Sequence, residues 1–273
     1  MILKRPNTFP DSDGEPMADS TLQAIWILIL YGNLLALFRN RDDVFVAANN
    51  LWYPLEDTDL VKMAPDAYVV FGRPKGHRGS YKQWQEGGIP LTVVFEVFSP
   101  GNTWREMMDK RDFCEEHGAE EFYILDPQDN ELVVYTRGPH GVALVRRYFK
   151  DSFVSPRLGI RFERREEGIA VFYPNGERFL SFEELKELQE QESARASAAE
   201  GRAEEAEGRA EEAEGRAEEA EGRAEEAEAG REEAENRLNL SKTRLARVIE
   251  LGRKARQGTA SPEELAELER LES

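Results

Sequence analysis

Short apolar runs separated by turn residues fill the first 175 or so residues of the chain. The longest run, Ala24 to Tyr31, follows the helix-capping residues Asp19 and Ser20, so a helix is predicted over 19–39. A second helix is predicted over 103–117, because Asn102 or Thr103 can cap its start and Gly118 its end. Strands are predicted near 44–48, 67–71, 91–98, 122–125, 132–135, 142–145, 159–162 and 169–172. This order predicts an α/β (α+β) domain over residues 1–180, with a mixed sheet and helices.

The C-terminal third has a different pattern. The heptapeptide Gly-Arg-Ala-Glu-Glu-Ala-Glu occurs four times without change from Gly201 to Glu228. Its alanines are spaced alternately by three and four residues, and the same frame contains larger apolar residues on both sides, namely Phe182, Leu185, Leu238, Leu245 and Val248. The spacing predicts a heptad-repeat helix over 181–257, either a spacer or the arm of a homodimer. Pairing is expected to be weak, because alanine buries little area and each repeat contains a glycine.

A short final helix is predicted within 258–273, where Ser261 supplies a cap and Pro262 and Glu263 suit a first turn.

Two carboxylates interrupt predicted buried strands. Asp66 directly precedes Ala67-Tyr68-Val69-Val70-Phe71, and Glu96 lies in the middle of Val93-Val94-Phe95-Glu96-Val97. An ionised carboxylate is costly to bury unless it is paired or binds a metal. The pair is explained by a shared positive centre, either a divalent cation or a Lys such as Lys110. It is equally explained by strands that expose one face, on which both carboxylates are simply solvated.

The composition restricts the function less than these residues do. The chain has a net charge of −18, of which −12 falls in residues 181–273. The N-terminal part is therefore only mildly acidic, which neither indicates nor excludes nucleic-acid binding. The single cysteine, Cys114, excludes an internal disulfide and fits a reducing cytoplasm. No apolar run has the length of a membrane span, so we expect a cytoplasmic protein without a membrane partner.

Two carboxylates on neighbouring strands suit a hard cation such as Mg²⁺ or Mn²⁺, and a cation held in this way can assist hydrolysis of a phosphodiester. The sequence carries further motifs in a fixed order: Pro65-Asp66, Glu96-Val97-Phe98-Ser99-Pro100, Lys110, and Glu120-Glu121-Phe122-Tyr123-Ile124-Leu125-Asp126-Pro127. Over about residues 10–180 this ordered set resembles the bacterial restriction endonuclease domain family of the Uma type, within the PD-(D/E)XK nuclease superfamily.

The resemblance implies a restriction-endonuclease-like mixed central sheet and a metal-dependent cut of DNA. It assigns Asp66 and Glu96 to metal binding. The superfamily usually places its catalytic Lys two residues after the second acid, where this chain has Phe98, so the resemblance points to Lys110 in the following helix. Some members use an acid of the first helix, for which Glu15 is the nearest candidate.

Other residues have two interpretations each. Ser99 either orients a water molecule or Glu96, or simply ends a strand before Pro100. The basic residues of the loop between the two acid-bearing strands either contact DNA phosphates or keep the loop soluble; they are Arg73, Lys75, Arg78 and Lys82.

Three functions remain open from the sequence. The first is a Mg²⁺- or Mn²⁺-dependent DNA endonuclease with a coiled-coil arm. The second is a catalytically degenerate nuclease-like domain that binds nucleic acid or protein, which the absence of Lys at position 98 favours. The third is a metal-independent hydrolase with two carboxylates, for example one acting on glycosides.

Overall fold

The computed structural model describes residues 8–12, 14, 16–138, 141 and 143–272. The chain divides into two compact units, residues 1–190 and 191–273, which are described separately. Within the described residues, no helix is both long enough and apolar enough to cross a membrane.

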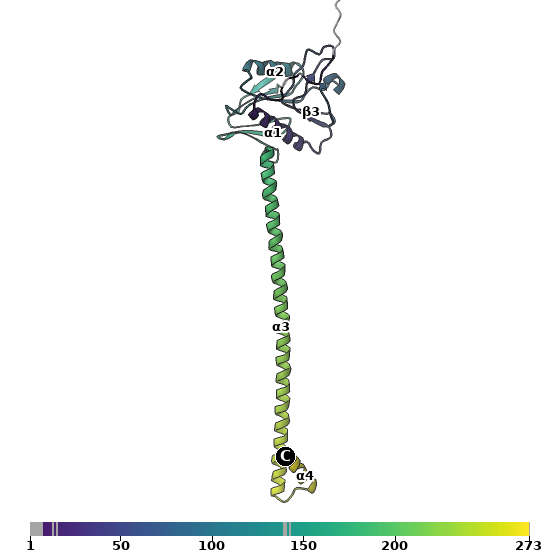
Figure 1. The fold of residues 1–273 in the computed structure, drawn as a ribbon, viewed down its shortest axis with the longest axis vertical. Helices are drawn as coiled ribbons and strands as arrows, with labels where there is room; N and C mark the ends of the chain where they lie inside the picture. Colours follow the sequence, from purple (N-terminus) through teal and green to yellow (C-terminus); the bar gives the residue numbers. More distant parts are fainter. Residues whose placement is uncertain (1–7, 13, 15, 139–140, 142, 273) are drawn as a thin grey trace, which may run out of the picture. The chain divides into compact units, whose positions relative to one another are not determined.

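The first unit (Figure 1) is built on a mixed sheet, and the order of its strands is β1-β3-β5-β6-β7-β8. Its strands are Val44–Ala47, Ala67–Phe71, Val93–Val97, Glu121–Asp126, Glu131–Arg137 and Leu144–Arg147. β5 and β6 run parallel, and the other neighbours in this sheet pair antiparallel. The α/β class with a mixed central sheet, predicted from the apolar runs, is confirmed.

Helix α1 (Thr21–Leu37) packs on one face of this sheet. It begins where the Ser20 side chain accepts a hydrogen bond from the Gln23 N–H, the arrangement expected of an N-cap. Its buried residues recur at helical spacing and pack with the odd-numbered residues of β3 and β5; they are Gln23, Ile27, Leu30, Asn33 and Leu34. This face holds one hydrophobic core of the unit.

Helix α2 (Trp104–Glu116) covers the opposite face. Its Met107 and Cys114 are buried with even-numbered residues of β3, β5 and β6, including Tyr68, Val94 and Phe122. Side chains of a strand alternate between faces, so β3 and β5, which are buried on both sides, read as continuous apolar runs.

Two smaller sheets complete the unit. β9 (Ser152–Val154), β10 (Arg161–Arg165) and β11 (Gly168–Phe172) form an antiparallel sheet whose apolar residues join the α1 core. β2 (Trp52–Tyr53) and β4 (Tyr81–Lys82) form a short parallel pair, followed by a 3-10 turn, η1 (Gln83–Glu86). The short strands β4 and β9 were not predicted, because two or three residues show no recognisable alternation.

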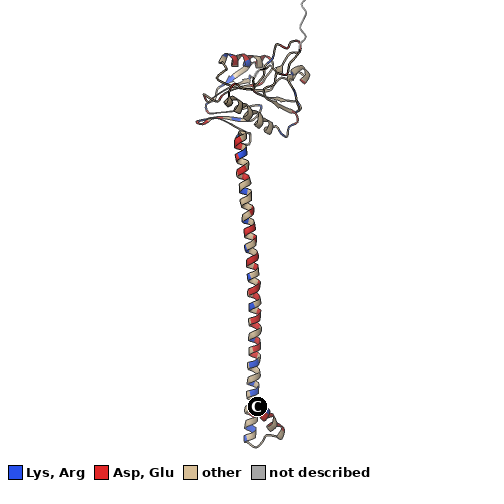
Figure 2. Cartoon of the chain, in the orientation of Figure 1, with Lys and Arg blue, Asp and Glu red and all other residues tan. Residues whose placement is uncertain are grey.

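Helix α3 (Phe182–Arg256) continues from the first unit into the second, where its residues up to about 246 are exposed. The predicted long C-terminal helix is thus confirmed, and acidic residues recur along it (Figure 2). Helix α4 (Pro262–Glu272) packs against the last turns of α3 through ion pairs of Arg247 with Glu267 (2.8 Å) and Lys254 with Glu264 (2.7 Å). Leu251 is buried at this contact.

Candidate functional site

Asp66 and Glu96 lie side by side on the face of the sheet that α2 covers. In the antiparallel register Ala67 is opposite Phe95, so the next step places Asp66 opposite Glu96. Residues that face each other across two strands project to the same side. The two carboxylates that the sequence singled out are therefore neighbours, as the hypothesis of a shared positive centre requires.

Lys110 supplies the positive charge at this position. Its Nζ donates a hydrogen bond of 2.6 Å to Oε2 of Glu96. The helix that carries it is fixed at its start by a capping box, in which the Thr103 side chain accepts from the Glu106 N–H and the Glu106 carboxylate accepts from the Thr103 N–H. Lys110 lies on the second turn after this cap and thus reaches down onto β5.

Glu96 is completely buried, and its second carboxylate oxygen has no partner in the described part of the chain. Oε1 of Glu96 makes no hydrogen bond to any described residue. Burial raises the pKa of Glu96 to about 8, an effect that Lys110 opposes and Asp66 reinforces. Burial also lowers the pKa of Lys110, but the carboxylates of Glu96 and Asp66 outweigh it, and this pKa lies above its usual value. At neutral pH the Glu96 carboxyl group consequently retains its proton, which an additional cation bound there would displace.

Asp66 is held by the backbone of the neighbouring strand. Its Oδ2 accepts a hydrogen bond of 2.6 Å from the Val97 N–H. Burial raises the pKa of Asp66, whereas the Val97 N–H and the charge of Lys110 act in the opposite direction. The carbonyl of Val97 in turn accepts from Nε2 of Gln23, 3.1 Å away, so α1 is connected to the same point of β5.

A cavity of about 410 Å³ opens beside these groups. Its lining includes Asp66 and Lys110, together with Asp19, Gln23 and Glu106. Lys110 contacts both the cavity and Glu96, whereas Glu96 is completely buried, so Lys110 lies between the cavity and that carboxylate.

Asp19 and Gln23 are site residues that the sequence did not reveal. Asp19 was interpreted only as a helix cap, and Gln23 was not singled out within the predicted first helix. Their place at the cavity depends on how α1 packs against β5. The one signal for the site in this helix is that Gln23, a polar residue, occupies a buried position.

The remaining candidates are placed as follows. Ser99 is buried, and its Oγ lies 3.2 Å from Oδ2 of Asp19 and 3.0 Å from Oδ1 of Asn102, so it holds the loop that borders the cavity. Glu15 lies outside the described residues.

The four basic loop residues do not line this cavity within the described part of the chain. Arg73 and Arg78 both pair with Glu86, at 2.7 and 2.6 Å, and Lys75 donates to the carbonyl of Arg39. Lys82 Nζ lies 6.0 Å from the ring of Phe9. The structure thus brings Asp66, Glu96 and Lys110 together but not these four, and the single charge of Glu86 is shared by two of the four basic residues.

The residues of the site fit a divalent cation in part. Two carboxylates meet on one face, and a buried carboxylate oxygen without a partner has the donor chemistry that Mg²⁺ and Mn²⁺ prefer. Among the described residues, no three His, Cys, Asp or Glu side chains gather closely enough to form a metal cluster. A cation at this position would therefore take Asp66 and Glu96 and complete its coordination with water, as Mg²⁺ commonly does.

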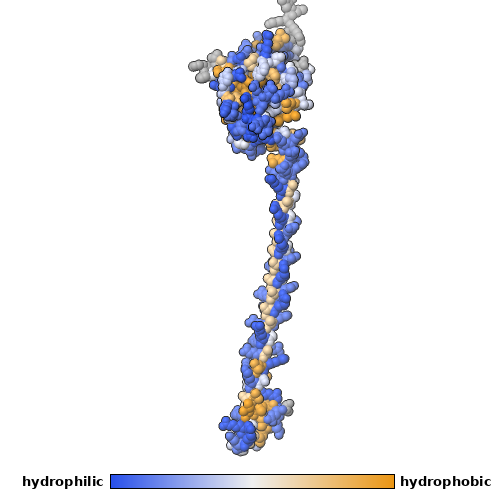
Figure 3. All heavy atoms as spheres, turned by 90° about the vertical axis from the view of Figure 1, so that its left-hand side faces the viewer, coloured by the Kyte–Doolittle hydropathy of each residue, from blue (hydrophilic) through white to orange (hydrophobic). Residues whose placement is uncertain are grey.

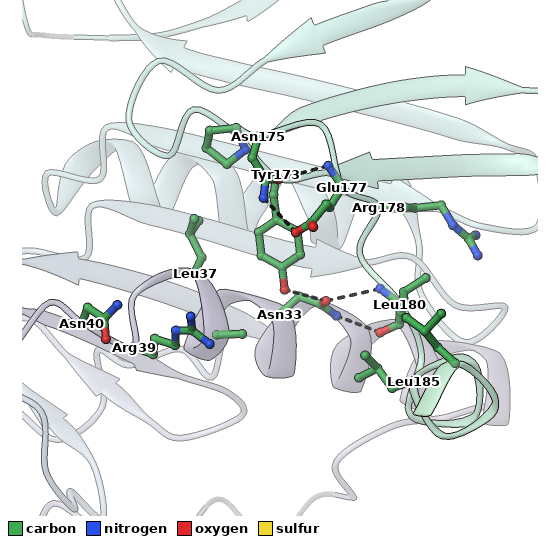
Figure 4. Close-up of a pocket in the computed structure, with 13 residues that line it drawn as sticks. Asn33, Leu37, Arg39, Asn40, Tyr173, Asn175, Glu177, Arg178, Leu180 and Leu185 are labelled. Carbon is green, nitrogen blue, oxygen red and sulfur yellow. Dashed lines mark hydrogen bonds between the residues drawn. The ribbon is translucent and has the colours of Figure 1, made fainter. Parts of the chain in front are cut away.

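A larger cavity, of about 770 Å³, lies elsewhere in the first unit, between the end of α1 and the start of α3 (Figure 4). At its floor, Asn33 Oδ1 accepts from the Tyr173 hydroxyl (2.8 Å) and the Leu180 N–H, while Asn33 Nδ2 donates to the Leu180 carbonyl. This network satisfies the buried amide and fixes the entry into α3. No pair of neighbouring carboxylates lines it among the described residues, so it does not compete as the hydrolytic site.

The first unit thus combines a mixed sheet with a pair of neighbouring carboxylates, and comparison with known proteins identifies its family. Residues 14–165, more than half of the chain, match the family described as "Uma2: Putative restriction endonuclease". The chain belongs to this family, which confirms the resemblance found in the sequence and supports a nuclease-like function.

Comparison with solved structures gives a similar chain described as a "putative nuclease belonging to DUF820" from Anabaena variabilis ATCC 29413. The two share 15% sequence identity with a TM-score of 0.40, over 56% of this chain and 85% of the other. Among curated proteins no sequence matches.

Proposed function

We propose that the N-terminal domain is a Mg²⁺- or Mn²⁺-dependent endonuclease that hydrolyses DNA phosphodiester bonds. The observation that carries the proposal is the fully buried oxygen of Glu96 that has no partner among the described residues, beside Lys110 and on the same face as Asp66. Family membership supports the same activity. A DNA substrate also agrees with the expected cytoplasmic location.

In this proposal the metal, when bound, supplies an activated water and neutralises charge that develops on the phosphate. Asp66 and Glu96 hold it, and the Val97 N–H keeps the Asp66 carboxylate in place. Lys110 places a positive charge between Glu96 and the cavity, where it can bind a phosphate oxygen or orient water. Gln23 fixes the Val97 carbonyl and therefore the end of β5.

The finer organisation of the chain is part of the proposal. We divide it into the nuclease-like domain over 1–180, the heptad helix over 181–257 and a C-terminal helix over 258–273. The heptad helix serves as a dimerisation arm, and DNA is the partner of the first domain.

The secondary candidates for phosphate contacts are Arg73, Lys75, Arg78 and Lys82. Lys82 is the best of them because it has no carboxylate partner among the described residues.

The test is plasmid cleavage in Mg²⁺ and in Mn²⁺ by the wild type, Glu96→Gln, Lys110→Met and Glu121→Gln. Glu121 is the matched control because it is also a buried carboxylate of the sheet, but the Tyr123 and Ser155 hydroxyls and the Arg157 N–H satisfy it on the other face. Cleavage should need the metal, survive Glu121→Gln and fall at least about 100-fold in the other two variants.

Other outcomes separate the competing functions. Cleavage lost in Glu96→Gln but retained in Lys110→Met would keep the endonuclease and remove Lys110 from the site. DNA binding without cleavage by any folded variant would establish a degenerate, binding-only domain. Hydrolysis of a glycoside that is indifferent to a chelator would identify the two-carboxylate hydrolase instead.

A further inference from the structure

The heptad frame of α3 is flanked by charges of opposite sign. When the alanines occupy positions a and d, every repeat places Arg at g and Glu at e. The g residues are Arg202, Arg209, Arg216 and Arg223, and the e residues are Glu207, Glu214, Glu221 and Glu228. Positions e and g border the seam of a coiled coil, and their charges set partner and orientation.

The arginines at g are largely unpaired within their own chain. Each donates its Nε to the backbone carbonyl four residues earlier, at 3.1–3.2 Å. Among the described contacts of these four, one ion pair occurs, a 3.7 Å contact of Arg216 with Glu212 at position c. Arg209, four residues after Glu205, donates to the Glu205 carbonyl oxygen, and no ion pair between the two side chains is described. The guanidinium ends and the e-position glutamates are thus available to another helix.

The seam itself is exposed and has larger apolar residues at both ends. Phe182 and Leu185 are 84% and 47% exposed, and Leu238 and Leu245 are 54% and 60% exposed. Figure 3 shows the weakly apolar stripe that runs between them along α3. Helix α4 contacts α3 through Arg244, Arg247, Leu251 and Lys254, which are g and c positions, so it leaves the seam at Leu245 open.

We propose that α3 pairs with α3 of a second copy of this chain as a parallel, in-register coiled coil. In a parallel pair, g of one helix faces e of the following heptad in the other, so Arg209 meets Glu214 of the partner and each repeat boundary adds an attraction. In an antiparallel pair, g faces g and e faces e, which sets Arg against Arg and Glu against Glu. The charge pattern selects the parallel arrangement.

The apolar ends fix the register. A shift by one heptad keeps the alanine repeats in phase, but it places Phe182 opposite Gln189 and leaves a leucine without its counterpart at the other end. The in-register pairing matches Phe182 with Phe182, Leu185 with Leu185 and Leu238 with Leu238. The middle of the seam is alanine, which buries little apolar area. The association therefore depends on the e and g charges and on the larger apolar residues at the two ends, and the dimer dissociates on dilution.

The consequence for the proposed activity is that both N-terminal domains are attached at the same end of the coiled coil. Two domains of a parallel dimer can act on the two strands of one duplex. The inference itself does not depend on the nuclease proposal, because it concerns α3 alone.

The experiment is sedimentation equilibrium of the full chain over a range of concentrations. The wild type should reach the mass of a dimer, and Glu96→Gln should match it. Replacing all four g arginines by Glu should weaken the dimer about 100-fold or more, because every attraction becomes a repulsion. Adding the reciprocal change, Glu→Arg at the four e positions, should restore it. A wild type that stays monomeric at about 100 µM, or a dimer indifferent to the four changes, would overturn the proposal.

Orientation is tested by disulfide formation. Ala203→Cys should crosslink to itself under mild oxidation, because in-register helices bring the two copies of position 203 together. The native Cys114 is buried, so the wild type serves as the uncrosslinked control. Crosslinking only in a mixture of Ala203→Cys with Ala227→Cys would show an antiparallel pair and contradict the proposal.

Discussion

At the scale of single residues, Glu96 is the point on which the site depends. It is a buried acid with one oxygen bound by Lys110 and one without a described partner. An unsatisfied buried polar atom in a folded protein calls for an explanation, such as a role in binding a cation. Burying the ionised form of Glu96 is unfavourable, and this raises its pKa. The folded protein therefore keeps the carboxyl group protonated at pH values where an exposed glutamate is ionised.

This pKa shift predicts how stability depends on pH without metal. The folded-state pKa of about 8 lies above the ordinary value of 4.5, so the stabilisation from protonated Glu96 is complete below pH 4.5 and is lost as the pH rises to 8. Relative to Glu96→Gln, the free energy of unfolding of the wild type should fall by up to about 1.4 kcal/mol per pH unit in that window and level off above it. Urea unfolding in a chelator measures this. Parallel pH profiles of the two proteins would contradict the assignment.

The contact of Lys110 with Glu96 predicts a coupling between the two positions. At pH 9, Lys110→Met should destabilise the wild type by about 1–3 kcal/mol, because it leaves an ionised buried carboxylate without a partner. The same change in a Glu96→Gln background should cost less than about 1 kcal/mol. The measurement is a double-mutant cycle by urea unfolding, and equal costs in both backgrounds would show that the contact is not made in solution.

Sequence reasoning found part of this site and missed part of it for physical reasons. Asp66 and Glu96 were visible because a carboxylate within an apolar strand is exceptional in itself. Lys110 was one candidate for the shared positive centre, and only the family resemblance assigned it to the site, since a lysine on a helix is ordinary until the helix is packed on the sheet. Asp19 was missed because its position depends on tertiary packing. The pairing of Arg78 with Glu86 was missed because it depends on the path of a loop.

At the scale of elements, the position of Lys110 depends on α2. The longer strands, α1 and α2 were predictable from apolar periodicity and caps, because both signals are local. The register that places Asp66 opposite Glu96 was not predictable, because strands distant in the chain set it.

The capping box at the start of α2 gives a test at this scale. Thr103→Ala should remove the bond to the Glu106 N–H and cost about 1 kcal/mol of stability, whereas Thr103→Ser should keep the bond and the stability. Both variants are compared by urea unfolding, and by metal-dependent cleavage to show whether a frayed first turn displaces Lys110. Equal stability of Thr103→Ala and the wild type would mean that the cap does not hold α2.

At the scale of the whole molecule, a domain of the restriction endonuclease family is followed in the chain by a long helix with a repeated pattern of charged residues. The heptad pattern was sufficient to predict the long α3, because a single helix needs no tertiary information. The same pattern does not by itself say whether α3 pairs, since alanine contributes little to a core. The signs of the e and g charges make that question testable.

The central claim is that Glu96 binds a divalent cation, and calorimetric titration of Mn²⁺ into the folded chain tests it most directly. At pH 8.5, where Glu96 is largely ionised, the wild type and Glu121→Gln should bind Mn²⁺ at a single site, and Glu96→Gln should bind it at least about tenfold more weakly. Binding should also weaken as the pH falls to 6.5, because a proton then competes for the carboxylate. Equal binding by the wild type and Glu96→Gln would contradict the account.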